Sequence, residues 1–243
     1  MKKLKLGKTG LIVSRYCIGT DYKGDVFPRK GGLLLKKAFD LGINFWDTAD
    51  NYGTHSHLKQ ALKYVPRENV VISTKISSTT RKQAIKDFAN CLKEINTDYI
   101  DIILLHGIDS ISEFKSLSAV LNYLHEAKQQ GLIKAVGLST HTISLAKYLT
   151  KEPKIEVILA PINIRGSNIN DGTQSQMNAQ LKKLYKAGKG IMAMKSLGGL
   201  RKTKFKDPKK AIKYVIDLPF IHSLAIGTRD LRQLNFNYKL FKQ

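Results

Sequence analysis

The sequence predicts an α/β fold, a (β/α)8 TIM barrel preceded by an N-terminal β-hairpin. Eight short apolar runs rich in β-branched residues alternate with segments of helical periodicity, and this alternation is typical of strand–helix units. The runs are almost continuously apolar, as parallel strands buried on both faces are. The 243 residues are enough for one such barrel. No linker or low-complexity segment divides them, so we expect a single domain over residues 1–243.

Each expected element follows from a local pattern. Residues 4–14 indicate a hairpin, because two short alternating runs flank a turn that contains Gly7 and Gly10. The expected barrel strands are residues 15–19, 43–46, 70–74, 100–105, 135–138, 157–160, 191–194 and 224–226. The expected helices are residues 32–41, 56–64, 85–95, 117–124, 143–149, 175–187, 208–217 and 231–240. An open doubly wound sheet is the alternative, but no Gly-x-Gly-x-x-Gly follows the first strand.

The composition is strongly basic, with 41 Lys and Arg residues against 19 Asp and Glu residues and a net charge of +22. Such a charge favours anionic partners, among them phosphorylated cofactors, although a lysine-rich solvated surface is the plainer interpretation. No basic stretch is interleaved with aromatic residues as a base-stacking surface requires. We therefore expect no nucleic-acid partner.

Cysteine content and hydropathy exclude several further classes. The two isolated cysteines, Cys17 and Cys91, make neither a disulfide framework nor a zinc or iron–sulfur set, so we expect no metal. No apolar stretch is long enough to span a bilayer, and no apolar run follows the basic first residues as in a signal peptide. These features predict a cytoplasmic protein without a membrane partner. A monomer is the simpler expectation for a closed barrel.

Four polar residues occupy the positions where barrel enzymes carry their chemistry. Reacting groups of such barrels lie at the C-terminal ends of the strands. Asp47, Lys75 and His106 end three successive predicted strands, and Tyr52 lies in the loop after the first of these. The sequence therefore directs an aspartate, a lysine and a histidine to one mouth, with a tyrosine close by.

This set suits the reduction of a carbonyl group. Hydride addition leaves an alkoxide that needs a proton, and a tyrosine hydroxyl with a pKa of about 10 is a weak acid at neutral pH. An adjacent Lys75 would lower that pKa, and Asp47 would hold the lysine charged. His106 could orient the carbonyl oxygen by a hydrogen bond. Taken singly, Asp47 could cap a strand and His106 could be a core histidine, but the joint pattern favours function.

Five segments of the sequence, in the same order, resemble the aldo-keto reductase family over nearly the whole chain. They are residues 42–53 (GINFWDTADNYG), 72–75 (ISTK), 97–106 (TDYIDIILLH), 128–139 (KQQGLIKAVGLS) and 190–199 (GIMAMKSLGG). The resemblance implies a barrel enzyme that reduces a small-molecule aldehyde or ketone with NADPH, or with NADH. It implies that Tyr52 is the general acid and that Asp47, Lys75 and His106 are its partners.

The resemblance also implies a set of cofactor-binding residues. Ser139 and Thr140 match the holders of the nicotinamide carboxamide, and Asn163 matches an asparagine of the sixth strand. A loop around the diphosphate is matched by Lys195, Ser196, Leu197 and Gly198, and the contacts to the adenosine end by Thr228, Arg229, Gln233 and Asn237.

Several positions depart from the family pattern. Thr140 stands where many members have asparagine, Leu159 where glutamine is frequent, and Met194 where many carry a tyrosine that stacks on the nicotinamide. Gln233 and Phe236 replace a frequent arginine and a common glutamate. These changes motivate an alternative, a non-catalytic cofactor-binding or regulatory member of the fold. The short motifs also resemble a compact branch that often carries a C-terminal iron–sulfur segment, which is absent from this sequence.

A lyase that works through an imine is a third hypothesis. Lys75 and Lys195 both lie at the ends of predicted strands. A lysine in an apolar barrel mouth can form an imine with a carbonyl compound. Tyr52 and Asp47 would then lack an evident role, so this hypothesis ranks below carbonyl reduction.

Overall fold

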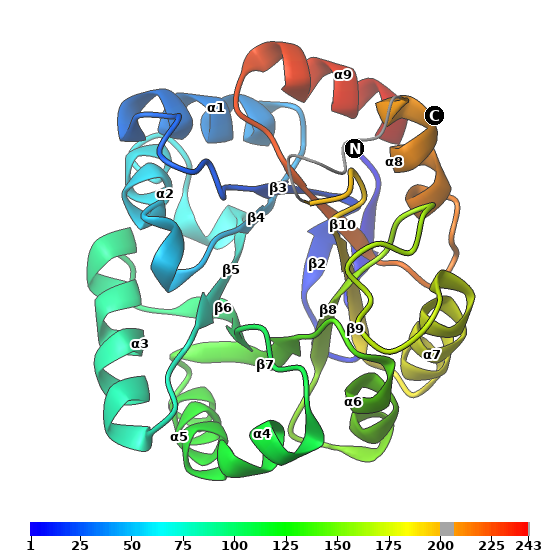
Figure 1. Cartoon of the computed structure of the whole chain (residues 1–243). Coiled ribbons are helices and arrows are strands. Elements are labelled where there is room, and N and C mark those ends of the chain that lie inside the picture. The colour runs from blue at the N-terminus through cyan, green and yellow to red at the C-terminus, as the bar shows by residue number, and fades with distance from the viewer. Residues whose placement is uncertain (200–206, 243) are drawn as a thin grey trace.

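In the computed structural model, parallel strands close into a barrel surrounded by helices (Figure 1). The barrel has eight strands. The structure describes residues 1–199 and 207–242. The strand order around the barrel is β10-β3-β4-β5-β6-β7-β8-β9. The strands are β3 (Tyr16–Gly19), β4 (Phe45–Asp47), β5 (Val71–Ile76), β6 (Ile100–Leu105), β7 (Ile133–Ser139), β8 (Val157–Pro161), β9 (Gly190–Met194) and β10 (Ser223–Gly227). The predicted (β/α)8 barrel is confirmed.

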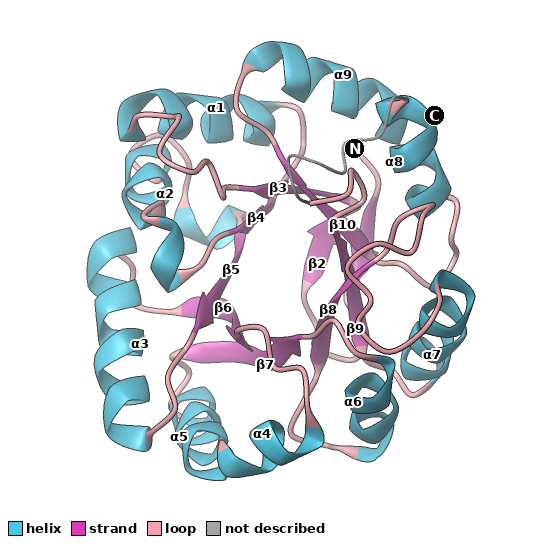
Figure 2. Cartoon of the chain, in the orientation of Figure 1, coloured by secondary structure: helices cyan, strands magenta, loops and turns pink. Residues whose placement is uncertain are grey.

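The helices form a layer outside the strands (Figure 2). In the described part of the chain they are α1 (Pro28–Asp40), α2 (His55–Ala61), α3 (Arg81–Ile95), α4 (Ile111–Ser116), α5 (Ser118–Gln129), α6 (Ile143–Tyr148), α7 (Gln174–Lys186), α8 (Pro208–Ile216) and α9 (Leu231–Phe241). The short α4 was not predicted. Its start is marked by Ser110, whose hydroxyl accepts a hydrogen bond from the Glu113 N–H at 3.1 Å.

The predicted N-terminal hairpin covers one end of the barrel. Its strands β1 (Lys3–Lys5) and β2 (Ile12–Ser14) are antiparallel. Leu6 and Val13 are fully buried and belong to one apolar cluster with side chains of the barrel strands. Gly7 adopts a φ of 54°, and a Cβ at this position would lie 2.5 Å from the backbone nitrogen of Gly190. The hairpin, which forms the floor of the barrel, therefore needs a glycine at position 7 for the left-handed backbone conformation and for the close approach to Gly190.

The barrel closes where the first strand, β3, pairs with the last, β10. Cys17 is in register with Ala225. The Tyr16 hydroxyl lies 2.6 Å from Thr228 Oγ1, and the Asn237 amide donates to the same hydroxyl at 2.9 Å. A buried polar chain therefore joins β3, the end of β10 and α9.

Candidate active site

The barrel brings Asp47, Lys75, His106 and Tyr52 to the C-terminal ends of neighbouring strands. Asp47 is the last residue of β4, Lys75 lies one residue before the end of β5, and His106 directly follows β6. Tyr52 ends a short 3-10 helix, Asp50–Tyr52, in the loop after β4. The pairing of β4 with β5 and of β5 with β6 sets these three strand ends side by side.

Lys75 and Asp47 form a buried ion pair. Lys75 Nζ lies 2.7 Å from Asp47 Oδ2 and donates a second bond to the Thr48 carbonyl at 2.6 Å. Burial acts to lower the pKa of Lys75, but Asp47 and the adjacent Tyr52 raise it, and the net pKa lies above the ordinary lysine value. Lys75 therefore remains an ammonium at neutral pH. Among the described residues Asp47 Oδ1 has no hydrogen-bond partner.

The Tyr52 ring lies close to both this ammonium and an imidazole. Lys75 Nζ is 4.8 Å from the centroid of the ring, and the His106 ring meets it edge-on at 5.8 Å. Burial raises the pKa of Tyr52 and outweighs the lowering by Lys75. The net direction is opposite to the expected one because the site removes hydration from the phenol. Tyr52 is therefore protonated at neutral pH.

His106 is also uncharged at neutral pH. Burial, followed by the positive charge of Lys75, lowers its pKa to about 4. A neutral imidazole keeps one N–H group that can donate a hydrogen bond.

A cavity of about 460 Å³ opens beside Tyr52, Lys75 and Asp47. It extends from them to five of the predicted cofactor positions, which are Lys195, Ser196, Leu197, Arg229 and Gln233. Arg229 Nη1 is paired with Asp25 Oδ2 at 2.6 Å. A larger surface groove of about 950 Å³ runs along α1 and the start of α9, but its described lining includes none of the four predicted catalytic residues.

Three other predicted cofactor residues are engaged with the protein itself. The Ser139 hydroxyl accepts from the Gly107 N–H at 2.7 Å, and the Thr140 hydroxyl donates to Asp109 Oδ1 at 3.3 Å. The Asn163 side chain is fully buried and bonds to backbone groups of the loop that follows it. These side chains shape the loops at the mouth.

The remaining three predicted positions lie where β3 meets β10 and α9, and in the β9–α8 connection. Thr228 and Asn237 are buried and bonded to Tyr16. Gly198 donates its N–H to the Lys195 carbonyl at 2.9 Å and adopts a φ of 89°. It stabilises the turn that carries Ser196 and Leu197 along the cavity.

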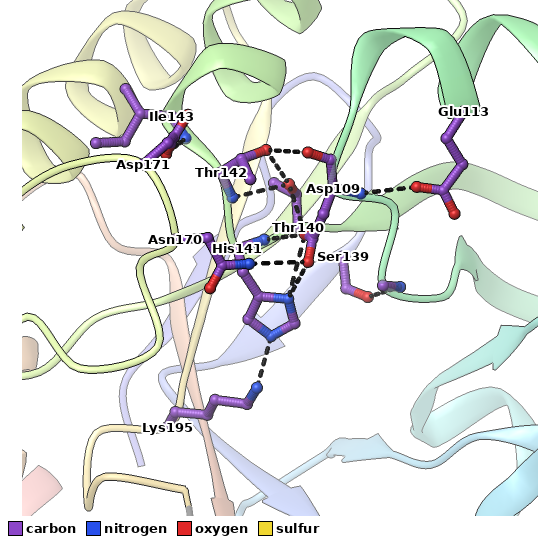
Figure 3. A network of polar contacts seen from close by, with 11 residues as sticks. Asp109, Glu113, Ser139, Thr140, His141, Thr142, Ile143, Asn170, Asp171 and Lys195 are labelled. Carbon is purple, nitrogen blue, oxygen red and sulfur yellow. Dashed lines mark hydrogen bonds and ion pairs between the residues drawn. The ribbon is translucent and has the colours of Figure 1, made fainter.

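Two polar residues at the same mouth were missed. Asp109 follows β6 and His141 follows β7, and His141 Nδ1 lies 3.1 Å from Asp109 Oδ2 (Figure 3). Both residues follow predicted strands, and this position in the sequence could have identified them as candidate site residues. Among the described residues, no group of three or more His, Cys, Asp or Glu is placed to hold a metal ion.

Comparison with known proteins identifies the family of the chain. Residues 25–241 match the profile of the Aldo/keto reductase family. The chain belongs to this family. The aldo/keto reductase assignment rests on a match over most of the chain, and it confirms the resemblance drawn from the sequence motifs.

Individual relatives of this aldo/keto reductase are distant in sequence. An Escherichia coli protein named NADH-specific methylglyoxal reductase is 27% identical, over 68% of this chain and 60% of its own length. A crystal structure of a Pseudomonas aeruginosa protein that carries the family's name is 26% identical, with a TM-score of 0.83, over 98% of this chain and 93% of that one. A Bombyx mori aldo-keto reductase solved in complex with NADP is 19% identical, with a TM-score of 0.78, over 100% of this chain and 88% of that one.

Matches to three curated relatives span 60%, 45% and 43% of those proteins' own length. In the described part of the chain, no helix combines the length and apolar character needed to cross a membrane.

Proposed function

We propose that this protein reduces a small aldehyde or ketone to an alcohol, with NADPH or NADH as hydride source and Tyr52 as general acid. The observation that carries the proposal is the buried Lys75–Asp47 pair, whose ammonium lies 4.8 Å from the Tyr52 ring at the wall of a cavity. Reduction of a carbonyl group needs a proton donor beside the carbonyl oxygen, and the Tyr52 hydroxyl is the proposed donor.

The proton-transfer step uses groups that are in the right protonation state. Tyr52 is protonated because burial raises its pKa, so its hydroxyl has a proton to donate to the carbonyl oxygen. The phenolate that remains is stabilised by Lys75, whose charge Asp47 maintains. Reprotonation from solvent then restores Tyr52.

His106 has an orienting role in this proposal. Its pKa of about 4 makes it neutral at working pH, so it donates a hydrogen bond without delivering a proton. The T-shaped contact between the His106 and Tyr52 rings, with centroids 5.8 Å apart, supports this role.

The residues along the cavity fit a phosphate-bearing dinucleotide. Lys195 and Arg229 provide positive charge, while Ser196 and Gln233 provide hydrogen-bonding groups beside the same cavity. A bound nicotinamide dinucleotide would supply the hydride. The other six predicted positions, which are Ser139, Thr140, Asn163, Gly198, Thr228 and Asn237, would support the loops that hold it.

A fluorescence titration tests cofactor binding first. Trp46 is the only tryptophan of the chain, is fully buried and precedes Asp47. Saturable quenching by NADPH or NADH would support the proposal, and the preferred dinucleotide would show whether the basic residues recognise a 2′-phosphate. Consumption of that cofactor with methylglyoxal or another small aldehyde would then establish reduction. No quenching and an unchanged melting temperature would favour the non-catalytic alternative.

A further inference from the structure

A second polar group lies at the barrel mouth, outside the proposed proton-donating cluster (Figure 3). It joins Asp109 after β6, His141 after β7 and Lys195 after β9. His141 Nδ1 lies 3.1 Å from Asp109 Oδ2, and His141 Nε2 lies 2.5 Å from Lys195 Nζ. The three side chains form a continuous carboxylate–imidazole–amine chain.

The orientation of this chain follows from how Asp109 is held. Its carboxylate accepts hydrogen bonds from the His141 backbone N–H at 2.6 Å and from the Asn170 amide at 3.2 Å. A carboxylate facing Nδ1 favours the tautomer with the proton on Nδ1, which leaves the Nε2 lone pair towards Lys195. Burial and then the charge of Lys195 lower the pKa of His141, so the ring is neutral at neutral pH and its Nε2 lone pair can accept the hydrogen bond from Lys195.

The two lysines at this mouth have opposite environments. Lys75 is 2% exposed, is paired with a carboxylate and has a raised pKa. Lys195 is partly exposed to the cavity, and its close partner is a neutral imidazole. Burial lowers the pKa of Lys195, and the more distant Asp109 offsets only part of that effect. Lys195 is therefore the lysine that can become a free amine.

The backbone holds the Lys195 side chain in place. Lys195 adopts a φ of 58°, which is uncommon for a residue with a side chain. A Cβ on Gly199 would lie 3.0 Å from Lys195 Cγ, so the glycine leaves the space that the lysine stem occupies. Lys195 lines the same cavity as Tyr52.

We propose that Lys195 is a second reactive group of this pocket, an amine that condenses with a small aldehyde to form an imine. His141 is its proton acceptor, and Asp109 is the positioning residue that orients His141. This reactivity goes beyond the proposed reduction and requires no nicotinamide cofactor.

The step balances without an oxidant or reductant. The Lys195 ammonium passes a proton to His141 Nε2, and the free amine attacks the aldehyde carbon, forming the C–N bond. The carbonyl π electrons move to the oxygen, which takes the proton back from His141. The carbinolamine then loses its hydroxyl group and a nitrogen-bound proton as water. The product is a protonated imine that retains the charge Lys195 had.

Reductive trapping tests the proposal. The protein is exposed briefly to limiting propanal and sodium cyanoborohydride at pH 7 without nicotinamide, and propylation of each lysine is quantified by peptide mass spectrometry. Lys59 and Lys147, both exposed on helices, provide the comparison. We expect Lys195 to react faster than these, because burial lowers its pKa and a larger share of its amine is therefore neutral at pH 7. Lys75 should stay unmodified.

A matched pair of variants tests the proton acceptor. His141→Gln keeps a hydrogen-bond acceptor for Lys195 but removes a group that can take a proton at neutral pH. We expect labelling of Lys195 to become slower in this variant, because the amine has lost the group that takes up its proton, and the pH profile of labelling to move to higher pH. His125→Gln, on α5 and bonded to the Lys154 carbonyl at 2.8 Å, should leave labelling unchanged.

The outcomes separate this proposal from a structural role. Lys195 labelling no faster than Lys59 would overturn it, and so would an unchanged rate and pH profile in a folded His141→Gln variant. Equal melting temperatures and circular dichroism of wild type and variant would establish that the fold is intact. Cofactor consumption on the same preparations tests the proposed reductase separately, because trapping proceeds without nicotinamide.

Discussion

At the level of single residues, Tyr52 shows how burial and charge act in opposite directions. Removal of water raises its pKa, while Lys75 lowers it. In the resting protein burial is the larger effect, and it keeps the phenol protonated. The lysine becomes important when the phenol loses its proton, because an ammonium stabilises a phenolate and has little interaction with a neutral hydroxyl.

Replacing Tyr52 by phenylalanine tests its role as acid. We expect kcat for aldehyde reduction to fall by roughly 10²–10⁴-fold, the usual contribution of a positioned general acid. Dinucleotide binding, followed by Trp46 fluorescence, should remain close to wild type because only a hydroxyl is removed. Undiminished turnover in Tyr52→Phe would exclude the tyrosine as proton donor.

Breaking the Lys75–Asp47 pair should be costly for stability. Asp47→Ala leaves a buried ammonium without its counter-charge, and we expect a loss of roughly 3–5 kcal/mol in the free energy of unfolding. Asp40→Ala removes the partner of Lys36 in an exposed pair with the similar distance of 2.8 Å, and should cost less than about 1 kcal/mol. Urea unfolding measures both, and similar losses would contradict a special role for the buried pair.

At the level of elements, the hairpin floor depends on one glycine more than on another. Gly7 and Gly10 share a left-handed conformation, with φ of 54° and 81°. A Cβ would meet the backbone of β9 at position 7, whereas nothing lies within 4 Å at position 10. The two sites therefore separate conformational cost from steric cost.

Alanine substitutions at these two sites measure the difference. Gly10→Ala should lose roughly 1–2 kcal/mol, the conformational cost alone, and Gly7→Ala should lose clearly more because the floor must move away from Gly190. The measurement is thermal or urea unfolding of both variants. Equal losses would mean that the hairpin adapts without disturbing the barrel.

Strands and most helices could be predicted because their patterns are local. All eight expected strand segments overlap observed strands, since nearly continuous apolar runs are what a doubly covered parallel sheet requires. The helix α4, Ile111–Ser116, was missed, although α6 has the same length and was predicted. Its Ser110 cap was the one local signal.

The candidate site could be predicted only in part. Asp47, Lys75 and His106 could be placed at one mouth because strand ends fix their positions. The turning of Thr228 and Asn237 towards Tyr16, and the contact of His141 with Lys195, depend on loop conformation and on packing between distant segments. Sequence spacing does not encode such contacts.

At the level of the whole molecule, buried histidines link stability to pH. The pKa values of His106 and His222 are both lowered to about 4, by burial first, against about 6.5 in an unfolded chain. Protonation therefore favours the unfolded state. Their contribution is fully present above about pH 6.5 and is lost as pH falls towards 4.

Unfolding free energies measured between pH 7 and pH 5 should consequently decrease as the solution becomes more acidic. His106→Asn should make this dependence shallower, because one of the two groups no longer takes up a proton on unfolding. His125→Asn on the surface of α5 provides the control and should keep the wild-type slope. A slope unaffected by His106→Asn would contradict the neutral, buried state assigned to this residue.

The pairing of β3 with β10 has a consequence for synthesis of the chain. The strand β3 ends at Gly19, but its partner β10 begins only at Ser223. Until β10 has been made, β3 therefore has one unpaired edge, and such an edge invites association with other chains. Until then the Tyr16 hydroxyl also lacks its hydrogen-bond partners Thr228 and Asn237. We therefore expect a polypeptide that stops short of β10 to leave the barrel open along β3.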